Sequence, residues 1–271
     1  RWILRTFIAE RRGYRKVLAA TSAKTVYMVN AARMPFQAAA QSLGMKVIEI
    51  QSGVFSKYSL QFSWPGSPAV DYLPNEIFTW GEYFTAGIEH AANQNIRVIG
   101  STDEFDSVRD ANIARNSKQV VFLTQPLVGA DILRAAIEFS RAKPKLNVIV
   151  KMHPRNDLEE FMGIIESEGG APANMSLVQS QRSSLEIIAE SEVAVGAFST
   201  ALIEAAGLGT RVAILRLPGW QHLAPLVEGG YASAFDNAHE LATNFENLRV
   251  AGDKYFFYGR KADLASIVRL G

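Results

Sequence analysis

Three basic side chains stand at alternate positions where an apolar run of the sequence ends. The run "VIVKMHPRN" occupies residues 148–156, so Lys151, His153 and Arg155 fall at or just past the end of a strand. Pro154 has no backbone N–H, and it therefore stops further strand pairing and fixes the local backbone. Cationic side chains in this position are suited to phosphate. The pattern predicts an anion site; a catalytic histidine and a solvated loop are the alternatives.

A serine and a threonine mark a second point where an apolar run meets a helical pattern. The sequence "VAVGAFSTALIEAAGLG" (193–209) predicts a buried strand running into Gly196, then Ser199, Thr200 and a helix. Free N–H groups and the helix dipole favour an anion at such a helix start. Glu204 lies one turn further on the face of Thr200, well placed to accept ribose hydroxyls. Ordinary helix capping with a surface glutamate is the alternative.

A long loop rich in serine and aromatic residues follows the strand that ends near Glu49. Its sequence is "IEIQSGVFSKYSLQFSWPG" (48–66), and long loops after strands of α/β folds are often functional. Its side chains can hydrogen-bond to and stack against a hydroxyl-rich ligand. The residues that we assign to this second ligand side are Gln51, Ser52, Gly53, Lys57 and Tyr58. A purely structural loop is the alternative.

Short β-branched runs alternate with helical patterns along the chain. Strands that are hydrophobic throughout, each followed by a helix, are typical of parallel sheets covered on both faces, so the predicted class is α/β. Strands are expected over residues 25–30, 46–50, 76–81, 96–100, 119–124, 147–152, 175–180, 192–197, 211–217 and 231–235. Helices are expected over residues 33–43, 82–93, 103–116, 129–142, 157–168, 183–190, 199–208 and 237–248.

The polar stretch "STDEFDSVRDANIARNSK" (101–118) interrupts this alternation, and the pattern restarts after it. About ten strands are many for one sheet, so we place a domain boundary there. The predicted domains are 1–105 and 117–250, followed by a C-terminal helix over 251–271. The first half opens on a helix with no strand before it, and we expect this domain to be incomplete. Ligands of such domains bind at the carboxyl ends of the strands, where Gln125 also lies.

The composition excludes several classes of function. The 271 residues carry a net charge of +1 without a long basic block, so there is no electrostatic footprint for duplex nucleic acid. There are no cysteines, which excludes disulfides, thiolate catalysis and Cys-ligated metals. No second histidine or carboxylate pair accompanies His153 at metal-ligand spacing, so no metal site is predicted.

The N-terminal sequence "RWILRTFIAERRGYRK" mixes basic and apolar residues. It lacks the long apolar stretch of a signal peptide, and no apolar run in the chain approaches the ~20 residues of a membrane span. The mixture predicts an amphipathic helix whose apolar face packs on the core. Peripheral contact with anionic lipid is the alternative.

The motifs of both halves resemble those of a known enzyme family. A strand followed by Lys-x-His-Pro-Arg, then about forty residues, then "FSTALIEAAGLG" and "RVAILRLPG" resembles the donor-binding domain of GT-B glycosyltransferases. The likeness is strongest to bacterial surface-polysaccharide enzymes: polysialyltransferases, Kdo transferases of capsule synthesis and CDP-glycerol glycerophosphotransferases. The first-half segments "EIQSGVFSKYSLQFSWPG" and "DYLPNEIFTWGEYF" are similar to a Glu-x-Gln-His-Gly-Val stretch and its continuation in such proteins.

This resemblance implies two Rossmann-like domains and a metal-independent transferase that needs no cofactor beyond its nucleotide-sugar donor. In that group a His-Pro pair and a Ser-Ser/Thr pair hold the phosphate of a cytidine nucleotide. Those roles fall here on His153-Pro154 and Ser199-Thr200, with Glu204 on the ribose. The implied donor is a CMP- or CDP-linked sugar or alditol phosphate, and the implied acceptor is a surface glycan, free or lipid-linked. The implied location is the bacterial cytoplasm or the inner face of its membrane.

The chain departs from that pattern at one point. Ser52 stands where related sequences carry a histidine or an acid, and an inverting transferase needs a base for the acceptor hydroxyl. Gln51 and Ser52 do not supply one unaided. Glu49 is the nearest carboxylate and the predicted catalytic partner of His153; Asp71 is another option. A nucleotide-sugar 2-epimerase, a non-catalytic nucleotide-sugar or glycan binding module and a periplasmic-type binding protein are the alternative functions.

Overall fold

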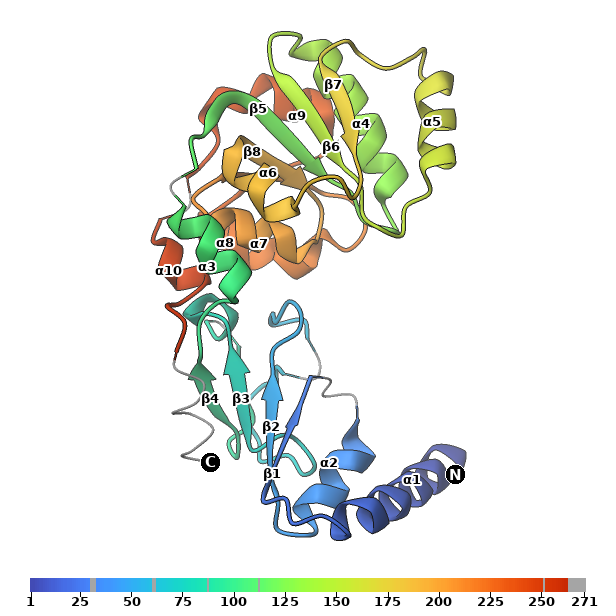
Figure 1. Ribbon diagram of the computed structural model, residues 1–271, viewed down its shortest axis with the longest axis vertical. Coiled ribbons are helices and arrows are strands. Elements are labelled where there is room, and N and C mark those ends of the chain that lie inside the picture. Colours follow the sequence, from blue (N-terminus) through green and yellow to red (C-terminus); the bar gives the residue numbers. More distant parts are fainter. Residues whose placement is uncertain (30–32, 60–61, 87, 112, 251, 263–271) are drawn as a thin grey trace. The chain divides into compact units, whose positions relative to one another are not determined.

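The computed structural model describes residues 1–29, 33–59, 62–86, 88–111, 113–250 and 252–262 (Figure 1). The chain forms two compact units. Unit 1 comprises Arg1–Ser101 and Tyr258–Gly271, and unit 2 comprises Thr102–Phe257. Residues 102–105, expected in the first domain, and residues 106–116, expected between the domains, thus belong to unit 2, and the chain returns to unit 1 at Tyr258.

Unit 1 is built on a four-stranded parallel sheet in the order β1-β2-β3-β4. Its strands are β1 (Thr25–Met28), β2 (Lys46–Ile50), β3 (Glu76–Thr79) and β4 (Asn95–Val98). Its helices are α1 (Trp2–Ala19), α2 (Met34–Gln41) and the short 3-10 helix η1 (Glu82–Phe84). The strands follow one another in sequence order, as right-handed crossovers on one side of a starting strand produce.

Two small apolar clusters and two ion pairs that share one buried carboxylate stabilise unit 1. One cluster joins β1 and β2 to α2 through Met28, Ala40, Met45 and Val47. The other consists of Ile48, Phe78 and Ile99. At the start of β3, Glu76 is only 4% exposed and pairs with Lys46 at 3.0 Å and Arg97 at 2.8 Å, which fixes β3 between its two neighbours.

Unit 2 is built on a six-stranded parallel sheet in the order β10-β9-β8-β5-β6-β7. Its strands are β5 (Asn116–Leu123), β6 (Asn147–Lys151), β7 (Met175–Val178), β8 (Ser191–Gly196), β9 (Arg211–Leu215) and β10 (Ser233–Phe235). The chain runs outward from β5 through β6 to β7, then returns to the centre and runs outward the other way from β8. This order defines a Rossmann-type sheet, and its switch point lies between β5 and β8.

Helices cover both faces of this sheet (Figure 1). They are α3 (Asp103–Asp110), α4 (Gly129–Ala142), α5 (Leu158–Ser167), α6 (Ser184–Glu190), α7 (Thr200–Gly207), α8 (Ala224–Glu228), α9 (Ala238–Thr243) and α10 (Lys254–Phe257), with the 3-10 helices η2 (Trp220–Leu223) and η3 (Phe245–Asn247). Several start on a side-chain cap that their sequences provide. The Thr102 hydroxyl accepts a hydrogen bond from the N–H of Phe105, and the Asp157 carboxylate accepts one from Glu159.

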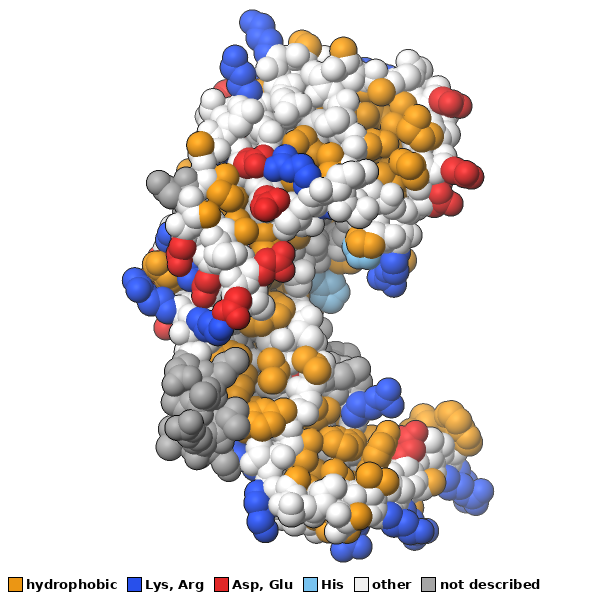
Figure 2. Space-filling model, viewed as in Figure 1, with side chains coloured by type: hydrophobic (Ala, Val, Ile, Leu, Met, Phe, Trp, Pro, Cys, Tyr) orange, Lys and Arg blue, Asp and Glu red, His pale blue; other side chains and the backbone are white. Residues whose placement is uncertain are grey.

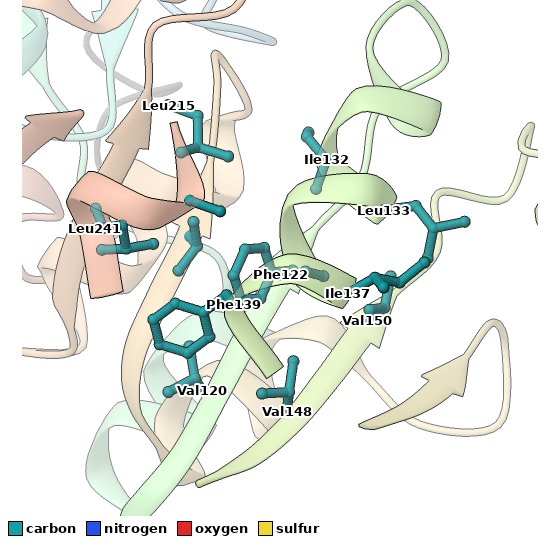
Figure 3. Packing of buried hydrophobic residues seen from close by; sticks show 14 of the residues in the cluster. Val120, Phe122, Ile132, Leu133, Ile137, Phe139, Val148, Val150, Leu215 and Leu241 are labelled. Atoms are coloured by element: carbon teal, nitrogen blue, oxygen red, sulfur yellow. The ribbon is translucent and has the colours of Figure 1, made fainter. Parts of the chain in front are cut away.

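A large apolar core of unit 2 lies between the central strands and helices α4 and α9 (Figure 3). Phe122 on β5 and Phe139 on α4 are fully buried, with ring centroids 5.5 Å apart. Phe139 also contacts Phe245, again with centroids 5.5 Å apart. These rings join β5, the helix α4 that follows it and η3 into one packed core.

The structure confirms the α/β class, the parallel sheets and each of the ten expected strands. The helix expected over residues 82–93 is wrong. Only η1 forms at its start, and residue 87 lies outside the described part of the chain. The backbone carbonyl of Glu89 accepts a hydrogen bond from the N–H of Trp64 at 2.6 Å, and the Asn93 side chain bonds both backbone groups of Val70. These tertiary bonds to the preceding loop replace helical ones.

The C-terminal helix expected over 251–271 is also largely absent from the described residues. Only α10, four residues long, is helical there, and residues 263–271 lie outside the description. Beyond α10 the chain runs along the edge of unit 1. The N–H of Gly259 donates to the carbonyl of Trp80 at 2.9 Å, and the N–H of Ala262 donates to that of Ile99 at 2.8 Å. The sequence pattern does not reveal such non-local pairing.

Replacing Phe139 with alanine is expected to lower the free energy of unfolding by about 3 to 5 kcal/mol, because the cavity it leaves is enclosed by the buried rings of Phe122 and Phe245. Urea denaturation followed by circular dichroism measures the loss. The control is Leu127→Ala, since Leu127 is 85% exposed and its loss should change stability by less than about 0.5 kcal/mol. Equal effects of the two changes would contradict the packing described here.

Candidate functional site

The loops that follow β5, β6 and β8 line one pocket in unit 2, with a volume of about 270 Å³. Its lining residues are Gln125, Pro126, Leu127, His153, Arg155, Phe198, Ser199 and Thr200. All lie just past the carboxyl ends of their strands, and β5 and β8 flank the switch point of the sheet. At a switch point the loops of neighbouring strands leave in opposite directions, which opens a crevice for a ligand. The structure thus brings together five residues that the sequence singled out separately.

The loop that carries His153 is fixed by the hydroxyl of Thr124, which is 5% exposed at the end of β5. This hydroxyl accepts a hydrogen bond from the backbone N–H of His153 at 2.9 Å and donates to the side-chain oxygen of Asn156 at 2.8 Å. The N–H of Asn156 in turn donates to the carbonyl of His153 at 2.9 Å and closes a turn. A single buried hydroxyl therefore sets the position of the loop relative to the central strand.

The imidazole of His153 has a defined hydrogen-bonding state. Its Nδ1 accepts a hydrogen bond from the backbone N–H of Arg155 at 3.1 Å, so the neutral ring carries its hydrogen on Nε2. Burial, followed by the positive charge of Arg155, holds the pKa of His153 below its ordinary value of 6.5. At neutral pH the ring is a neutral Nε2–H donor, and an anion in the pocket would favour its protonated form.

Ser199 and Thr200 stand at the start of α7 and form the opposite wall of the pocket. The Ser199 hydroxyl caps the helix by accepting a hydrogen bond from the N–H of Ala201 at 3.2 Å. The capping that we set against an anion-binding role is therefore present. The two roles can coexist, because Thr200 at the helix start still lines the pocket, with Arg155 on the facing loop, and a helix start favours an anion.

Gln125 joins the two loops at the switch point. Its side-chain oxygen accepts a hydrogen bond from the backbone N–H of Phe198 at 3.1 Å, and the NH₂ group of the same amide takes no part in this bond. Phe198 rests against Gly219, which has a φ of +94°. A Cβ atom on that glycine would lie 2.8 Å from the Phe198 ring. Gly219 thus allows both the turn of the backbone and the close approach of the Phe198 ring, which lines the pocket.

Two of the predicted phosphate-binding residues lie differently from what the spacing suggested. Lys151 is only 8% exposed, and its ammonium donates a hydrogen bond to the backbone carbonyl of Gln179 beyond β7. Burial lowers its pKa, and it is not among the residues that line the pocket. Pro154 is exposed in the turn between His153 and Arg155, where it shapes the backbone.

Glu204 lies one turn beyond Thr200 on α7 and is half-buried. Burial, and then the negative charge of Glu104 on α3, raise the pKa of Glu204 to about 7. The carboxylate of Glu104 accepts a hydrogen bond from the hydroxyl of Ser183 at 3.4 Å. Near neutral pH, Glu204 is therefore present in both its neutral and its ionised form. It lies on α7, one turn beyond the residues of that helix that line the pocket.

The residues assigned to the second ligand side lie in unit 1, mostly in the loop after β2. Gln51 is 2% exposed; its NH₂ group donates to the carbonyl of Gly53 at 2.8 Å, and its oxygen accepts from the N–H of Trp80 at 2.9 Å. These bonds give Gln51 a structural role. Ser52 is exposed and donates to the carbonyl of Val29 at 3.0 Å.

Three further predicted residues of unit 1 differ in their access to solvent. Lys57 and Tyr58 are exposed, with the ammonium of Lys57 5.4 Å from the centre of the neighbouring ring. Glu49, on β2, is 2% exposed. An acceptor hydroxyl cannot reach the carboxylate of Glu49 in this arrangement. The role of Glu49 as a base therefore stays a prediction, and it requires the residues around Glu49 to move.

Sequence reasoning missed the residues that position the pocket. Thr124 and Asn156 do so by hydrogen bonds, and Phe198 by forming a wall. Thr124 immediately precedes Gln125, and Asn156 ends the "KMHPRN" segment, so their place beside strand ends was the available signal. Within the described part of the chain, no three His, Asp or Glu side chains gather as a metal site would require. None of the helices described there is long and apolar enough to cross a membrane.

Known structures share this architecture, whereas no protein-family model and no curated protein sequence matches the chain. The calicheamicin glycosyltransferase CalG4 superposes with a TM-score of 0.65 over 98% of this chain and 80% of its own, at 12% identity. MurG from Acinetobacter baumannii gives 0.59 over 96% and 76%, at 12% identity. The UDP-GlcNAc 2-epimerase from Methanocaldococcus jannaschii, in complex with UDP-GlcNAc and UDP, gives 0.58 over 98% and 81%, at 15% identity.

These likenesses define the fold. The chain has the GT-B architecture of two Rossmann-like domains, each with a parallel sheet between helices. That confirms the fold expected from the sequence motifs. Sequence identities this low carry neither donor nor acceptor from those proteins to this chain, and the function must be argued from the pocket itself.

Replacing Thr124 with valine is expected to destabilise unit 2 by about 1 to 3 kcal/mol, because it leaves the N–H of His153 and the Asn156 side chain without their buried partner. Thr124→Ser keeps the hydroxyl and should recover most of this loss. Urea unfolding of the three proteins measures the difference. If the valine and serine variants were equally stable, the hydroxyl would not be what holds the loop.

Replacing Glu204 with glutamine is expected to stabilise the protein above pH 7 and to change its stability little near pH 5. A raised pKa means that the folded state favours the neutral carboxyl. The resulting contribution of Glu204 to folding stability is complete below the ordinary pKa of 4.5 and is lost as the pH rises through about 7. Glutamine carries no charge at any pH, so the expected gain at pH 8 is about 1 to 3 kcal/mol.

Urea unfolding at pH 5 and pH 8 tests this pH dependence. Glu160→Gln, at an exposed position of α5, controls for the change in net charge. A stability difference between wild type and Glu204→Gln that stayed constant from pH 5 to pH 8 would show that Glu204 does not titrate in this range.

Proposed function

We propose that the protein is a glycosyltransferase that holds the phosphate of a nucleotide-sugar donor in the pocket of unit 2. One observation carries the proposal. The switch-point pocket is lined from the β6 loop by His153 and Arg155, and from the start of α7 by Ser199 and Thr200. Imidazole, guanidinium, hydroxyl groups and a helix start are complementary to an anion such as the phosphate of a nucleotide.

The same groups suit the chemistry of glycosyl transfer. An acceptor hydroxyl oxygen attacks the anomeric carbon, the bond from that carbon to the phosphate oxygen breaks, and the nucleotide leaves with the electron pair. Arg155, the His153 ring and the α7 start stabilise the negative charge that develops on the leaving phosphate. We propose that these groups carry that charge without a metal ion, so activity should survive EDTA.

Different observations support the proposed identities of the donor and of the acceptor. One of the similar structures is named as a glycosyltransferase, and another contains UDP-GlcNAc and UDP, which supports a nucleotide sugar as ligand. The resemblance carried by the Lys-x-His-Pro-Arg and Phe-Ser-Thr motifs implies a CMP- or CDP-linked donor and a bacterial surface glycan as acceptor, used in the cytoplasm. We place the ribose near Glu204 and the acceptor near Lys57 and Tyr58 of unit 1. The proton of the acceptor passes to a base that the pocket does not contain, and Glu49 is the proposed candidate.

A nucleotide-sugar 2-epimerase is the second candidate, because an enzyme of that name shares the fold over 98% of this chain. It would use the same phosphate pocket, but it would act on a free nucleotide sugar without an acceptor. Interconversion of UDP-GlcNAc and its C2 epimer, followed by NMR in the absence of acceptor, identifies this activity. Release of nucleotide only when a glycan acceptor is added identifies the transferase.

His153→Ala is expected to weaken nucleotide binding at least about tenfold, because it removes both the Nε2–H donor and the potential cation. A nucleotide that binds only the folded state raises the melting temperature, so a thermal-shift series with CMP, CDP, UMP, UDP and GDP measures the effect. His239→Ala, at an exposed position on α9 of the same unit, is the matched control and should bind like wild type.

The pH dependence separates a phosphate contact from a general loss of structure. Since the pKa of His153 is lowered in the free protein and an anion favours its protonated form, the affinity advantage of wild type over His153→Ala should grow as the pH falls from about 7.5 to 6. Stabilisation by a uridine nucleotide would keep the transferase and reject the cytidine donor. A protein that no nucleotide stabilises would overturn the proposal.

A further inference from the structure

Helix α1 packs on the rest of unit 1 with one side only, and its larger side makes no such contact. Phe7 contacts Tyr72 with ring centroids 5.7 Å apart, and Tyr14 meets the edge of Phe36 at 5.3 Å. Leu18 packs on the apolar cluster of β1, β2 and α2. These contacts fix the orientation of the helix, yet no residue of α1 is buried.

Large hydrophobic side chains remain on the side of α1 that faces solvent. Trp2 and Ile3 are each 77% exposed, Leu4 is 62% exposed and Val17 is 68% exposed. Single exposed hydrophobic residues are normal on a protein surface. Three consecutive ones, among them a tryptophan, form a hydrophobic tip at the first turn of the helix, and such a tip suits an apolar or interfacial partner.

The same helix concentrates the positive charge of the chain. Residues 1–19 hold six of the 28 Lys and Arg residues and one of the 27 acidic residues, so they carry a net charge of +5 while the rest of the chain carries −4. Figure 2 shows the Lys and Arg side chains gathered along α1, with hydrophobic side chains at the end that bears the N-terminus. This distribution is hidden in the overall net charge of +1.

Three of these cations line a common groove. Arg11, Arg12 and Arg15, together with Ile8 and Ser42, surround a cavity of about 410 Å³. Arg11 is held in place by the Tyr72 ring, with its guanidinium carbon 5.7 Å from the ring centre. The planar guanidinium group binds phosphate oxygens in pairs, and the Ser42 hydroxyl adds a further donor. The groove therefore offers donors that suit phosphate oxygens, next to an apolar residue, Ile8.

We propose that α1 docks the protein on an anionic phospholipid membrane. The arginines of the groove bind lipid phosphates, and the tip of Trp2, Ile3 and Leu4 enters the interface between headgroups and acyl chains. Tryptophan prefers that interface, and a helix with cationic and apolar side chains lies in its plane. A membrane offers both partners at once, a negatively charged surface above an apolar layer, and no free phosphate does.

The inference does not rest on the proposed transfer reaction, because it concerns unit 1 and a different set of residues from the phosphate pocket of unit 2. If both hold, the membrane contact lies in the unit to which we assign the acceptor, as a lipid-linked glycan would require. Nucleotide binding and vesicle binding are separate measurements, so either proposal can fail alone.

Co-sedimentation with vesicles tests the inference. Wild-type protein is expected to bind vesicles of phosphatidylglycerol and phosphatidylcholine, to bind vesicles of phosphatidylcholine alone at least about tenfold more weakly, and to lose binding as salt is raised. Reversing two exposed charges, in Arg12→Glu with Arg15→Glu, should weaken binding to the anionic vesicles at least about tenfold. Trp2→Ser with Ile3→Ser should weaken it by removing the tip.

The matched control is Lys118→Glu with Lys145→Glu, which changes the net charge equally at exposed positions of unit 2 and should leave vesicle binding unchanged. The melting temperature and nucleotide binding of each variant show that it is folded. Equal losses in the control and in the α1 variants would reduce the effect to net charge and overturn the assignment to α1.

Other occupants of this surface give different results. Failure to bind either kind of vesicle would overturn the proposal. So would equal binding to anionic and neutral vesicles, which would leave the arginines without a role. Binding to an RNA oligonucleotide but not to vesicles would assign the cations to nucleic acid, and a dimer abolished by Trp2→Ser with Ile3→Ser would assign the tip to a second copy of the chain. Each of these outcomes excludes the membrane as the partner.

Discussion

The reversal of strand order between β5 and β8 is the constraint on which the candidate site depends. Two neighbouring parallel strands whose following segments leave in opposite directions cannot cover their own carboxyl ends. The gap is framed by Gln125 from one strand and by Ser199 with α7 from the other. Because a helix begins at that gap, its dipole is directed into it. Topology alone therefore creates an anion-friendly position before any side chain contributes.

Short polar bonds convert that opening into a defined pocket. The Thr124 hydroxyl fixes the loop of His153, and the Gln125 amide holds the backbone at Phe198. Each bond lies at or near the buried end of a strand, where a lost partner could not be replaced by water. Burial also lowers the pKa of His153 and raises that of Glu204, so both side chains favour their neutral forms, and a bound phosphate would favour protonation of His153.

The strands could be predicted from the sequence because each parallel strand buried on both faces is a short, continuous apolar run bounded by polar residues. The same local logic failed for residues 82–93, whose backbone pairs with the distant 64–70 segment instead of with itself. It also gave Lys151 to the phosphate site, although its side chain reaches the carbonyl of Gln179. A side chain at the end of a strand can turn toward either neighbour, and spacing along the chain does not decide which.

The sequence by itself determined the α/β class, the strands and the identity of the residues that can bind an anion, because periodicity and residue chemistry are local properties. Only the tertiary structure decided that His153, Arg155, Ser199 and Thr200 share one pocket, since that depends on strand order. The tertiary structure likewise buries Gln51 and hydrogen-bonds its side chain to the backbone of unit 1, and it leaves the charged side of α1 exposed. Both outcomes depend on contacts between segments far apart in the chain, and the pattern of any one segment does not record them.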